Sequence, residues 1–399
     1  MVLSYDAVQK RYRFSSIDDV SGLLDVYEGD FDSTGALAVS NVGTGKVRPP
    51  SGAVWALLLA SCLYACGGAP YSPSTASPSG ALATLVEDVR QGRFGMVGAL
   101  LVARGDNLLG EHYFRGQTRD TPVPIYSVTK SVTSLLAGLA IVDGRIPAVT
   151  VPLSVLLPDH ETLLRADARR ERITLRDLLT MQAGIAWDEF AAPYDDPRNP
   201  VGVMLSSPDW LGYVLGQPMA RPPGETFVYN SGLSVVLGEA VARAVGRPLR
   251  EFAQERLFSP LGIPTPAWHS GPGGVANSGG GLSMRAVDLL ALGRLVRDRG
   301  RQGQARIVAD DWIEESTSAV TSSSLGTRYG YQWWRLGPDG GFDPRRPVIA
   351  AIGWGGQSIV ILPDDGLVAV TTAANFGSDA LVFTQELARR LVRVADEAR

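Results

Sequence analysis

Apolar residues follow two different periods along the chain, and these periods separate regions of strand from regions of helix. Residues 79–93 have one apolar helical face, and residues 96–103 and 108–114 are predicted as two strands joined by a turn at 104–107. From residue 150 to about 320 the pattern is mainly helical, with long connections rich in Pro and Gly. Strand patterns return over 329–335, 348–352, 358–362 and 368–372, and an amphipathic helix is predicted at 379–397.

Strands at both ends with helices between them predict the class of fold. A turn at Asp364–Gly366 links the last two strands as a hairpin, which favours antiparallel pairing. Thr174 begins a capping box that opens a short helix ending before Gly184. We therefore expect an α/β protein of the α+β type, in which both chain ends form an antiparallel sheet flanked by helices, with an inserted, mainly helical region.

One apolar run, residues 53–65, is too short to span a membrane but has the length of a signal-peptide core. Lys46 and Arg48 stand before it as a basic region. Leu63–Cys66 resembles a bacterial lipobox, whose cysteine is lipidated after cleavage, although Tyr64 stands where a small residue is usual. We expect a signal peptide at 47–66, a Gly-, Ser- and Pro-rich tether at 67–80, and a protein that is exported and lipid-anchored at Cys66 in a bacterial cell envelope.

The position of this signal is unusual, because signal peptides stand at the N-terminus and this one begins some forty residues in. The sequence therefore predicts that residues 1–46 are a non-native or disordered extension, and that translation begins near Val42 or Val47. The alternative is a genuine extension followed by a buried apolar helix.

Composition excludes several classes of function. The net charge of −4 over 399 residues gives no sign of nucleic-acid binding. The three histidines, His112, His160 and His269, are scattered without metal-ligand spacing. We expect neither a metal nor another cofactor.

Lysine is rare in this chain, and the position of one lysine suggests a catalytic role. Lys10, Lys46 and Lys130 are the only three lysines, while arginine supplies the other positive charges. Lys130 follows Ser127 in a Ser-x-x-Lys motif. Arginine stays protonated, whereas a buried lysine can shift its pKa and exchange a proton, so Ser127 is a candidate activated nucleophile.

The surroundings of this motif predict that it opens a helix. Pro122 and Pro124 keep the preceding chain extended, and apolar residues follow at helical spacing. Residues three apart on a helix are neighbours, so the Lys130 ammonium can reach the Ser127 hydroxyl. Ser127 would also lie in the first turn of this helix, where free backbone N–H groups and the helix dipole stabilise a developing anion. The alternative is a serine that caps the helix, with a lysine in solvent.

Two further segments have unusual composition. In residues 223–232, Pro-Gly makes a turn that places Tyr229 on a loop before a helix beginning near Leu233. In residues 353–357, glycines enter the strand at 358–362 and permit close approach of another backbone or a ligand.

With these three groups, the chain resembles the serine beta-lactamase and penicillin-binding-protein superfamily over about residues 80 to 395. The branch that it looks like holds class C beta-lactamases, D,D-peptidases, family VIII esterases and 6-aminohexanoate-dimer hydrolases. Ser127–Lys130 matches the first motif of the family, Tyr229–Ser231 matches its Tyr-x-Asn/Ser motif, and Trp354–Gly356 occupies the place of Lys-Thr-Gly or His-x-Gly. The resemblance implies a beta-lactamase/transpeptidase-like fold and a serine hydrolase domain at 81–399.

The resemblance also implies roles for individual residues. Ser127 would become acylated, and either Lys130 or Tyr229 would take its proton. Ser231 would hold Lys130 in position. The backbone N–H groups of Ser127 and Gln357 would form an oxyanion hole, and Trp354, Gly355 and Gly356 would contact the substrate.

Trp354 departs from the family pattern, because in beta-lactamases and D,D-peptidases a Lys or His at this place helps to hold a substrate carboxylate, whereas an indole has no charge. This favours an ester or amide without a carboxylate there, unless a nearby arginine substitutes. An apolar acyl pocket could include any of four tryptophans, Trp187, Trp210, Trp333 and Trp334.

The sequence thus predicts an esterase or amidase that forms an acyl-enzyme on Ser127, acts on a small ester, amide or peptide, and needs no cofactor. Three alternatives stay open: a beta-lactamase or D,D-carboxypeptidase, a non-catalytic cell-envelope protein that binds penicillin-like ligands, and an alpha/beta hydrolase using Ser127, Asp188 and His269. The last lacks a Gly-x-Ser-x-Gly motif.

Overall fold

The computed structural model describes residues 2–6, 11–17, 23–31, 37–46, 80–318, 320–323 and 325–397. The chain divides into two compact units, Met1–Tyr71 and Ser72–Arg399. The predicted signal peptide, the lipidation site at Cys66 and the tether up to residue 79 lie outside the described residues.

The first unit contains a four-stranded antiparallel sheet in which consecutive strands are neighbours. Its strands are β1 (Val2–Asp6), β2 (Arg11–Ile17), β3 (Leu23–Phe31) and β4 (Leu37–Lys46). These strands do not test where translation begins, so the later start stays a prediction.

The second unit is built on an eight-stranded antiparallel sheet, in the order β12-β13-β14-β15-β16-β17-β5-β6. Its strands are β5 (Val97–Arg104), β6 (Asn107–Tyr113), β12 (Thr321–Ser322), β13 (Arg328–Tyr329), β14 (Trp334–Leu336), β15 (Val348–Gly353), β16 (Gln357–Leu362) and β17 (Leu367–Ala373). The predicted sheet of both chain ends is confirmed, because β17 pairs with β5 from Leu367 opposite Arg104 to Ala373 opposite Val97.

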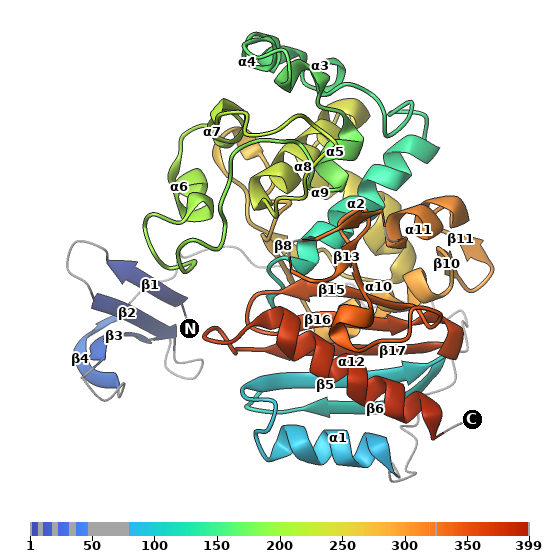
Figure 1. Ribbon diagram of the computed structural model, residues 1–399. Helices are drawn as coiled ribbons and strands as arrows, with labels where there is room; N and C mark the ends of the chain where they lie inside the picture. The colour runs from blue at the N-terminus through green and yellow to red at the C-terminus, as the bar shows by residue number, and fades with distance from the viewer. Residues whose placement is uncertain are drawn as a thin grey trace, which may run out of the picture. The chain divides into compact units, whose positions relative to one another are not determined.

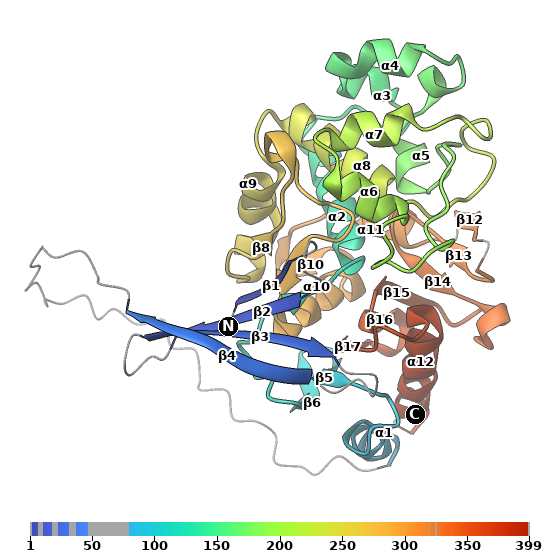
Figure 2. The ribbon, with the colours of Figure 1, turned by 90° about the vertical axis from the view of Figure 1, so that its left-hand side faces the viewer.

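Helices cover both faces of this sheet, so its central strands are buried along their whole length. Figures 1 and 2 show α10 on one face and α12 on the other, beside α1. The helices of the second unit are α1 (Ala81–Arg90), α2 (Val128–Val142), α3 (Leu153–Leu156), α4 (Glu161–Arg165), α5 (Leu175–Leu179), α6 (Pro200–Ser206), α7 (Trp210–Gly216), α8 (Ser231–Val245), α9 (Leu249–Ala253), α10 (Ala286–Arg297), α11 (Asp310–Thr317) and α12 (Ala380–Asp396). Within the described ranges, no helix combines the length and apolar character needed to cross a bilayer.

The helical region between β6 and β12 contains the predicted short helix α5, and its capping box at Thr174 and Asp177 is present. Two small sheets were not predicted. One joins β7 (Val123–Pro124), β9 (Leu282–Met284) and β8 (Ala267–Trp268); the other pairs β10 (Arg301–Gln302) with β11 (Ala305–Arg306). The first sheet matters for the site, because β7 leads directly to Ser127.

The single strand predicted at 329–335 is wrong. The structure has β13 and β14 instead, separated by a turn in which Gln332 has a φ of 63°. The buried Gln332 side chain donates hydrogen bonds to the Leu178 and Leu179 carbonyls and accepts one from Ser234 Oγ at 2.7 Å. Gln332 therefore leaves the sheet because its amide is satisfied by the neighbouring helices α5 and α8.

Candidate active site

Ser127 stands at the start of α2, where the chain leaves β7. The preceding residue, Tyr126, has a φ of 45°, a conformation that an L-residue adopts at a cost of about 1–2 kcal/mol. The Ser127 side chain makes no hydrogen bond to the helix backbone, so its hydroxyl is available to other partners. The alternative of a capping serine is therefore wrong.

Lys130 is buried with its ammonium among three oxygens. Nζ lies 2.8 Å from Ser127 Oγ, 2.8 Å from Ser231 Oγ and 2.6 Å from the Gly279 carbonyl. Only 1% of the residue is exposed, which rules out the alternative of a solvated lysine. Burial lowers the pKa of Lys130 to about 8, because loss of water disfavours the ammonium, while the negative charge of Glu189 partly opposes the change.

Tyr229 closes the loop before α8 and lies against the same groups. Its side chain hydrogen-bonds that of Ser127, and Lys130 Nζ lies 5.0 Å from the centre of its ring. The ring stacks on Phe190 and on Trp334, at centroid distances of 5.6 and 5.7 Å. Burial and the nearby negative charge of Glu189 raise the pKa of Tyr229, so the phenol keeps its proton near neutral pH.

The third motif forms the hairpin between β15 and β16 and lies against the nucleophile segment. A Cβ added to Gly353 would come within 2.4 Å of the Ile125 carbonyl oxygen, so only glycine permits this approach. Gly355 and Gly356 both have positive φ, at 79° and 92°. The Gln357 amide donates to the Ala373 carbonyl at 2.5 Å and accepts from the Ala373 N–H at 3.0 Å, which ties the hairpin to β17.

Trp354 belongs to an aromatic wall, and its only hydrogen-bond donor is already in use. The indole N–H donates to the Phe376 carbonyl at 3.2 Å. The ring packs against Tyr126 and Tyr194, each with a centroid distance of 5.3 Å, and against Phe376 at 4.7 Å. Trp354 therefore offers an apolar surface to a ligand.

A cavity of about 450 Å³ opens onto Ser127. Its lining is mainly aromatic and aliphatic: Ser127, Phe190, Tyr194, Tyr229, Leu325, Trp334, Ile352, Gly353, Trp354, Ser378, Asp379, Ala380 and Leu381. None of these lining residues is Lys, Arg or His, so the alternative of a substituting arginine finds no support among them. The single charged residue in the lining is Asp379, whose carboxylate accepts from two backbone N–H groups at the start of α12.

Of the four tryptophans considered for an acyl pocket, one lies in the lining of this cavity. Trp334 lines the cavity. Trp333 is buried in the core, and Trp210 stacks on His269. Trp187 instead donates its indole N–H to Glu189 at 3.0 Å. The alternative triad with Asp188 and His269 is also wrong, since the sheet is antiparallel and the side chains that hydrogen-bond Ser127 are Lys130 and Tyr229.

Sequence reasoning missed two groups that hold the site together. One is the Gly279 carbonyl, which accepts from Lys130. The other is Glu189, 2% exposed, which accepts from Ser231 Oγ and from the Ser231 N–H at 2.6 Å each. Glu189 lies in a loop rich in turns, where apolar residues have no regular spacing. The nearby aromatic residues Trp187 and Phe190 are the local feature of the sequence that indicates a buried position for it.

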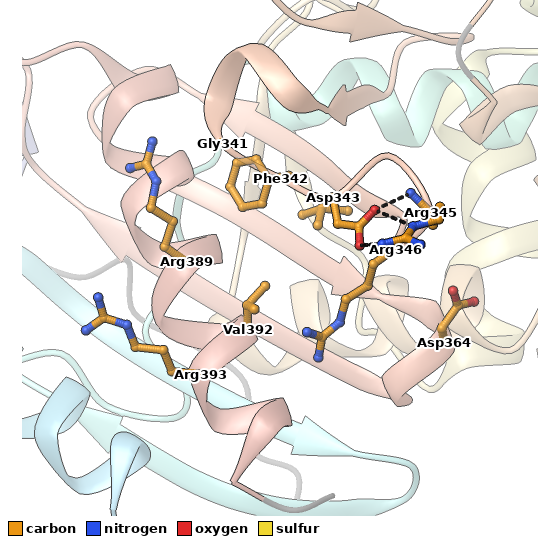
Figure 3. A pocket seen from close by; sticks show the side chains of 10 residues that line it. Gly341, Phe342, Asp343, Arg345, Arg346, Asp364, Arg389, Val392 and Arg393 are labelled. Carbon is orange, nitrogen blue, oxygen red and sulfur yellow. Dashed lines mark hydrogen bonds and ion pairs between the residues drawn. The ribbon is translucent and has the colours of Figure 1, made fainter.

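A second cavity, of about 650 Å³, lies between α12 and the segment before β15 (Figure 3). Arginines dominate its lining, and several are neutralised: Arg345 pairs with Asp343, and Arg346 pairs with Asp365 and Asp396. It contains none of the predicted catalytic residues. In the described parts of the chain, no cluster of three or more His, Cys, Asp or Glu side chains has the arrangement of a metal site.

Comparison with known proteins gives a consistent result. The family model described as Beta-lactamase matches residues 82–393. The 6-aminohexanoate-dimer hydrolase of Paenarthrobacter ureafaciens is 28% identical over 312 residues, which cover 73% of this chain and 76% of that protein. Esterase EstB of Burkholderia gladioli is 28% identical over 42% of this chain and 43% of its own length.

Solved structures share the fold. The penicillin binding protein from Bacillus halodurans superimposes with a TM-score of 0.61 at 18% identity, over 78% of this chain and 99% of that one.

Proposed function

The chain belongs to the beta-lactamase family and is a serine hydrolase of that family, and we propose that it cleaves neutral esters or amides through an acyl-enzyme on Ser127. The observation that carries this proposal is the buried Lys130 amine, 2.8 Å from the Ser127 hydroxyl and with a pKa lowered to about 8. Such an amine is partly neutral near pH 7 and can accept a proton.

In the proposed reaction, Ser127 Oγ bonds to the carbonyl carbon of the substrate and passes its proton to Lys130 Nζ. The raised pKa of Tyr229 supports Lys130 as the base of this step and Tyr229 as a neutral hydrogen-bonding partner that delivers a proton to the leaving group. The backbone N–H groups of Ser127 and Gln357 would stabilise the oxyanion, typically by about 3–4 kcal/mol for each donor. The Tyr229 phenolate left by this proton transfer takes back a proton from the Lys130 ammonium, through the Ser127 oxygen that both groups contact. Water then attacks the acyl carbon and gives a proton to Lys130, which returns it to Ser127 Oγ as the carboxylic acid is released.

The cavity supports a substrate whose acyl part is apolar and uncharged. Its walls include the rings of Phe190, Tyr194 and Trp334, and its lining residues contain no cation. Trp354 has no free donor to replace the cation of relatives, because its N–H binds the Phe376 carbonyl. A substrate carboxylate would therefore lose its hydration without a charged partner. A relative named as an esterase fits this class of substrate.

The test of this function is covalent labelling at a single residue. The wild-type protein should gain one adduct from a fluorophosphonate probe, located at Ser127 by peptide mass spectrometry. The Ser127→Ala variant should neither be labelled nor hydrolyse p-nitrophenyl butyrate. Its melting temperature should be unchanged, because the half-buried hydroxyl lines the cavity and its loss breaks no helix cap. Labelling or full turnover in this variant would refute the assignment.

Export and lipid anchoring are a further part of the proposal, supported by the residues 53–66. We propose that the mature protein begins at a lipidated Cys66 and acts in a bacterial cell envelope. Mass spectrometry of the native N-terminus would detect the lipid, whereas a peptide from residues 11–40 in the native protein would contradict the late start.

A further inference from the structure

Glu189 lies beside Ser231 and Lys130, but it has no role in the reaction proposed for Ser127. Each of its carboxylate oxygens accepts two hydrogen bonds. Oε1 accepts from Ser231 Oγ at 2.6 Å and from the Tyr194 hydroxyl at 2.8 Å, and Oε2 accepts from the Ser231 N–H at 2.6 Å and from the Trp187 indole at 3.0 Å. A group that accepts four hydrogen bonds in a buried place is the carboxylate ion, because the acid form would have to donate one.

This arrangement fixes the direction of the next hydrogen bond. Ser231 has one hydroxyl proton, and that proton is given to Glu189. The oxygen of Ser231 is therefore left as an acceptor toward Lys130, 2.8 Å away. The Gly279 carbonyl, at 2.6 Å, can only accept as well.

The orientation of the Lys130 lone pair follows from these two acceptors. A neutral amine has two N–H bonds and one lone pair. When the two N–H bonds point to Ser231 and Gly279, the lone pair faces the third neighbour, Ser127 Oγ, at 2.8 Å. The Ser127 hydroxyl then donates to Lys130, which is the geometry for proton transfer.

We propose that Glu189 is a positioning residue: by holding the Ser231 proton, it aims the lone pair of the neutral Lys130 amine at the Ser127 hydroxyl. The proposal rests on the function proposed above, in which Lys130 takes the Ser127 proton as Oγ bonds to the carbonyl carbon. The ammonium formed in that step is balanced by the negative charge of Glu189, with Ser231 between them.

Few other groups can affect the charge of Lys130. The titratable side chains that face it or Glu189 are Tyr229 before α8, Tyr194 in the loop of Glu189, and Tyr329 in β13, and burial raises the pKa of all three phenols. These phenols stay neutral, so Glu189 supplies the formal charge beside Lys130. Because that charge raises the pKa of Lys130, its removal should lower this pKa.

The composition of the chain makes Lys130 directly observable. Lys10 and Lys46 are the only other lysines of the sequence, so a protein labelled with ¹³C and ¹⁵N lysine gives three side-chain signals at full length and one in the mature form proposed above, which begins at Cys66. The signal that disappears in Lys130→Arg belongs to Lys130. We expect Glu189→Gln to move its NMR titration to lower pH. Glu315→Gln is the matched control, since Glu315 also accepts from a tyrosine, Tyr331 at 2.5 Å, but lies outside the site. That control should leave the titration unchanged.

Kinetics test the positioning itself. At pH values above the pKa of Lys130, Glu189→Gln should lower kcat for p-nitrophenyl butyrate by about 10- to 100-fold. The Ser231 hydroxyl can then donate to the lone pair of Lys130, which is no longer held toward Ser127. KM should change little. Ser231→Ala should cause a similar loss with the Glu189 charge intact, and Glu189→Gln should add little in the Ser231→Ala background if Glu189 acts through Ser231.

The outcomes separate this proposal from the general function. An unchanged Lys130 titration in Glu189→Gln, or a kcat loss that adds in full to that of Ser231→Ala, would overturn the role of Glu189 while leaving Ser127 labelling as it is. If Glu189→Gln does not fold, Ser231→Ala decides alone: an unchanged plateau kcat in that variant overturns the proposal. A wild-type protein without Ser127 labelling would instead refute the hydrolase mechanism, and the NMR titration would still measure the effect of Glu189 on Lys130.

Discussion

The lowered pKa of Lys130 predicts how the rate depends on pH. With a pKa of about 8, the amine is about 9% neutral at pH 7 and about 91% neutral at pH 9. An ordinary lysine would be about 0.03% neutral at pH 7, so burial raises the amount of base roughly 300-fold. In the proposed reaction the neutral amine takes the Ser127 proton, so kcat/KM should rise about tenfold from pH 7 to pH 9, with an inflection near pH 8.

The assay is the pH profile of kcat/KM for a short-chain p-nitrophenyl ester, and of a linear amide that does not hydrolyse spontaneously in base. Ser127→Ala gives the background rate at each pH. Lys130→Arg keeps the charge but holds its proton throughout this range, so it should be nearly inactive and show no inflection. No histidine lines the cavity, so none competes as the source of an inflection near pH 8. A flat profile, a profile that falls above pH 7, or wild-type rates in Lys130→Arg would refute the reasoning.

Three other substitutions test separate parts of the site. Tyr229→Phe keeps the stacked ring but removes the hydroxyl, and stopped-flow and steady-state assays should find kcat lower by at least about 10²-fold with little change in KM; a change in KM alone would mean that Tyr229 only binds substrate. Trp354→Lys restores the cation of relatives, so the ratio of nitrocefin to p-nitrophenyl butyrate turnover should rise about 10- to 100-fold, and an unmoved ratio would contradict the apolar assignment of this wall. Gly353→Ala would press a Cβ against the Ile125 carbonyl and should lower kcat/KM by about 10²-fold, whereas Gly337→Ala, with open space around it, should change neither activity nor melting temperature.

Local spacing explains why part of the site was predictable. Ser127 and Lys130 are three residues apart on one helix, so their contact follows from helix geometry alone. The glycines at 355 and 356 have positive φ, a property that consecutive glycines suggest. The strands near the end of the chain were found because β15, β16 and β17 are short apolar runs bounded by turns.

The missed features depend on contacts between residues far apart in the sequence. Glu189 reaches Ser231 across 42 positions, and no periodic pattern marks a loop that buries a carboxylate. Gln332 had the surroundings of a strand, but its amide bonds to α5 removed it from the sheet. The Trp354 indole N–H binds the Phe376 carbonyl, 22 positions along the chain, and no local pattern in the sequence marks this contact. Each of these outcomes is set by hydrogen-bond partners that only the folded chain supplies.

The pairing of β5 with β17 has a consequence for the newly made protein. Leu367 lies opposite Arg104, so β5, which is buried over Val97–Ala103 in the folded protein, must wait for a partner strand made about 260 residues later. At typical rates of synthesis this interval is roughly 10–50 s. During it, the hairpin of β5 and β6 has an unpaired apolar edge, open to the same strand of another nascent chain. Ser127 and Lys130 are made early in this interval, but the hairpin that lies against them is made near its end, so a growing chain carries its proposed nucleophile long before the site is complete.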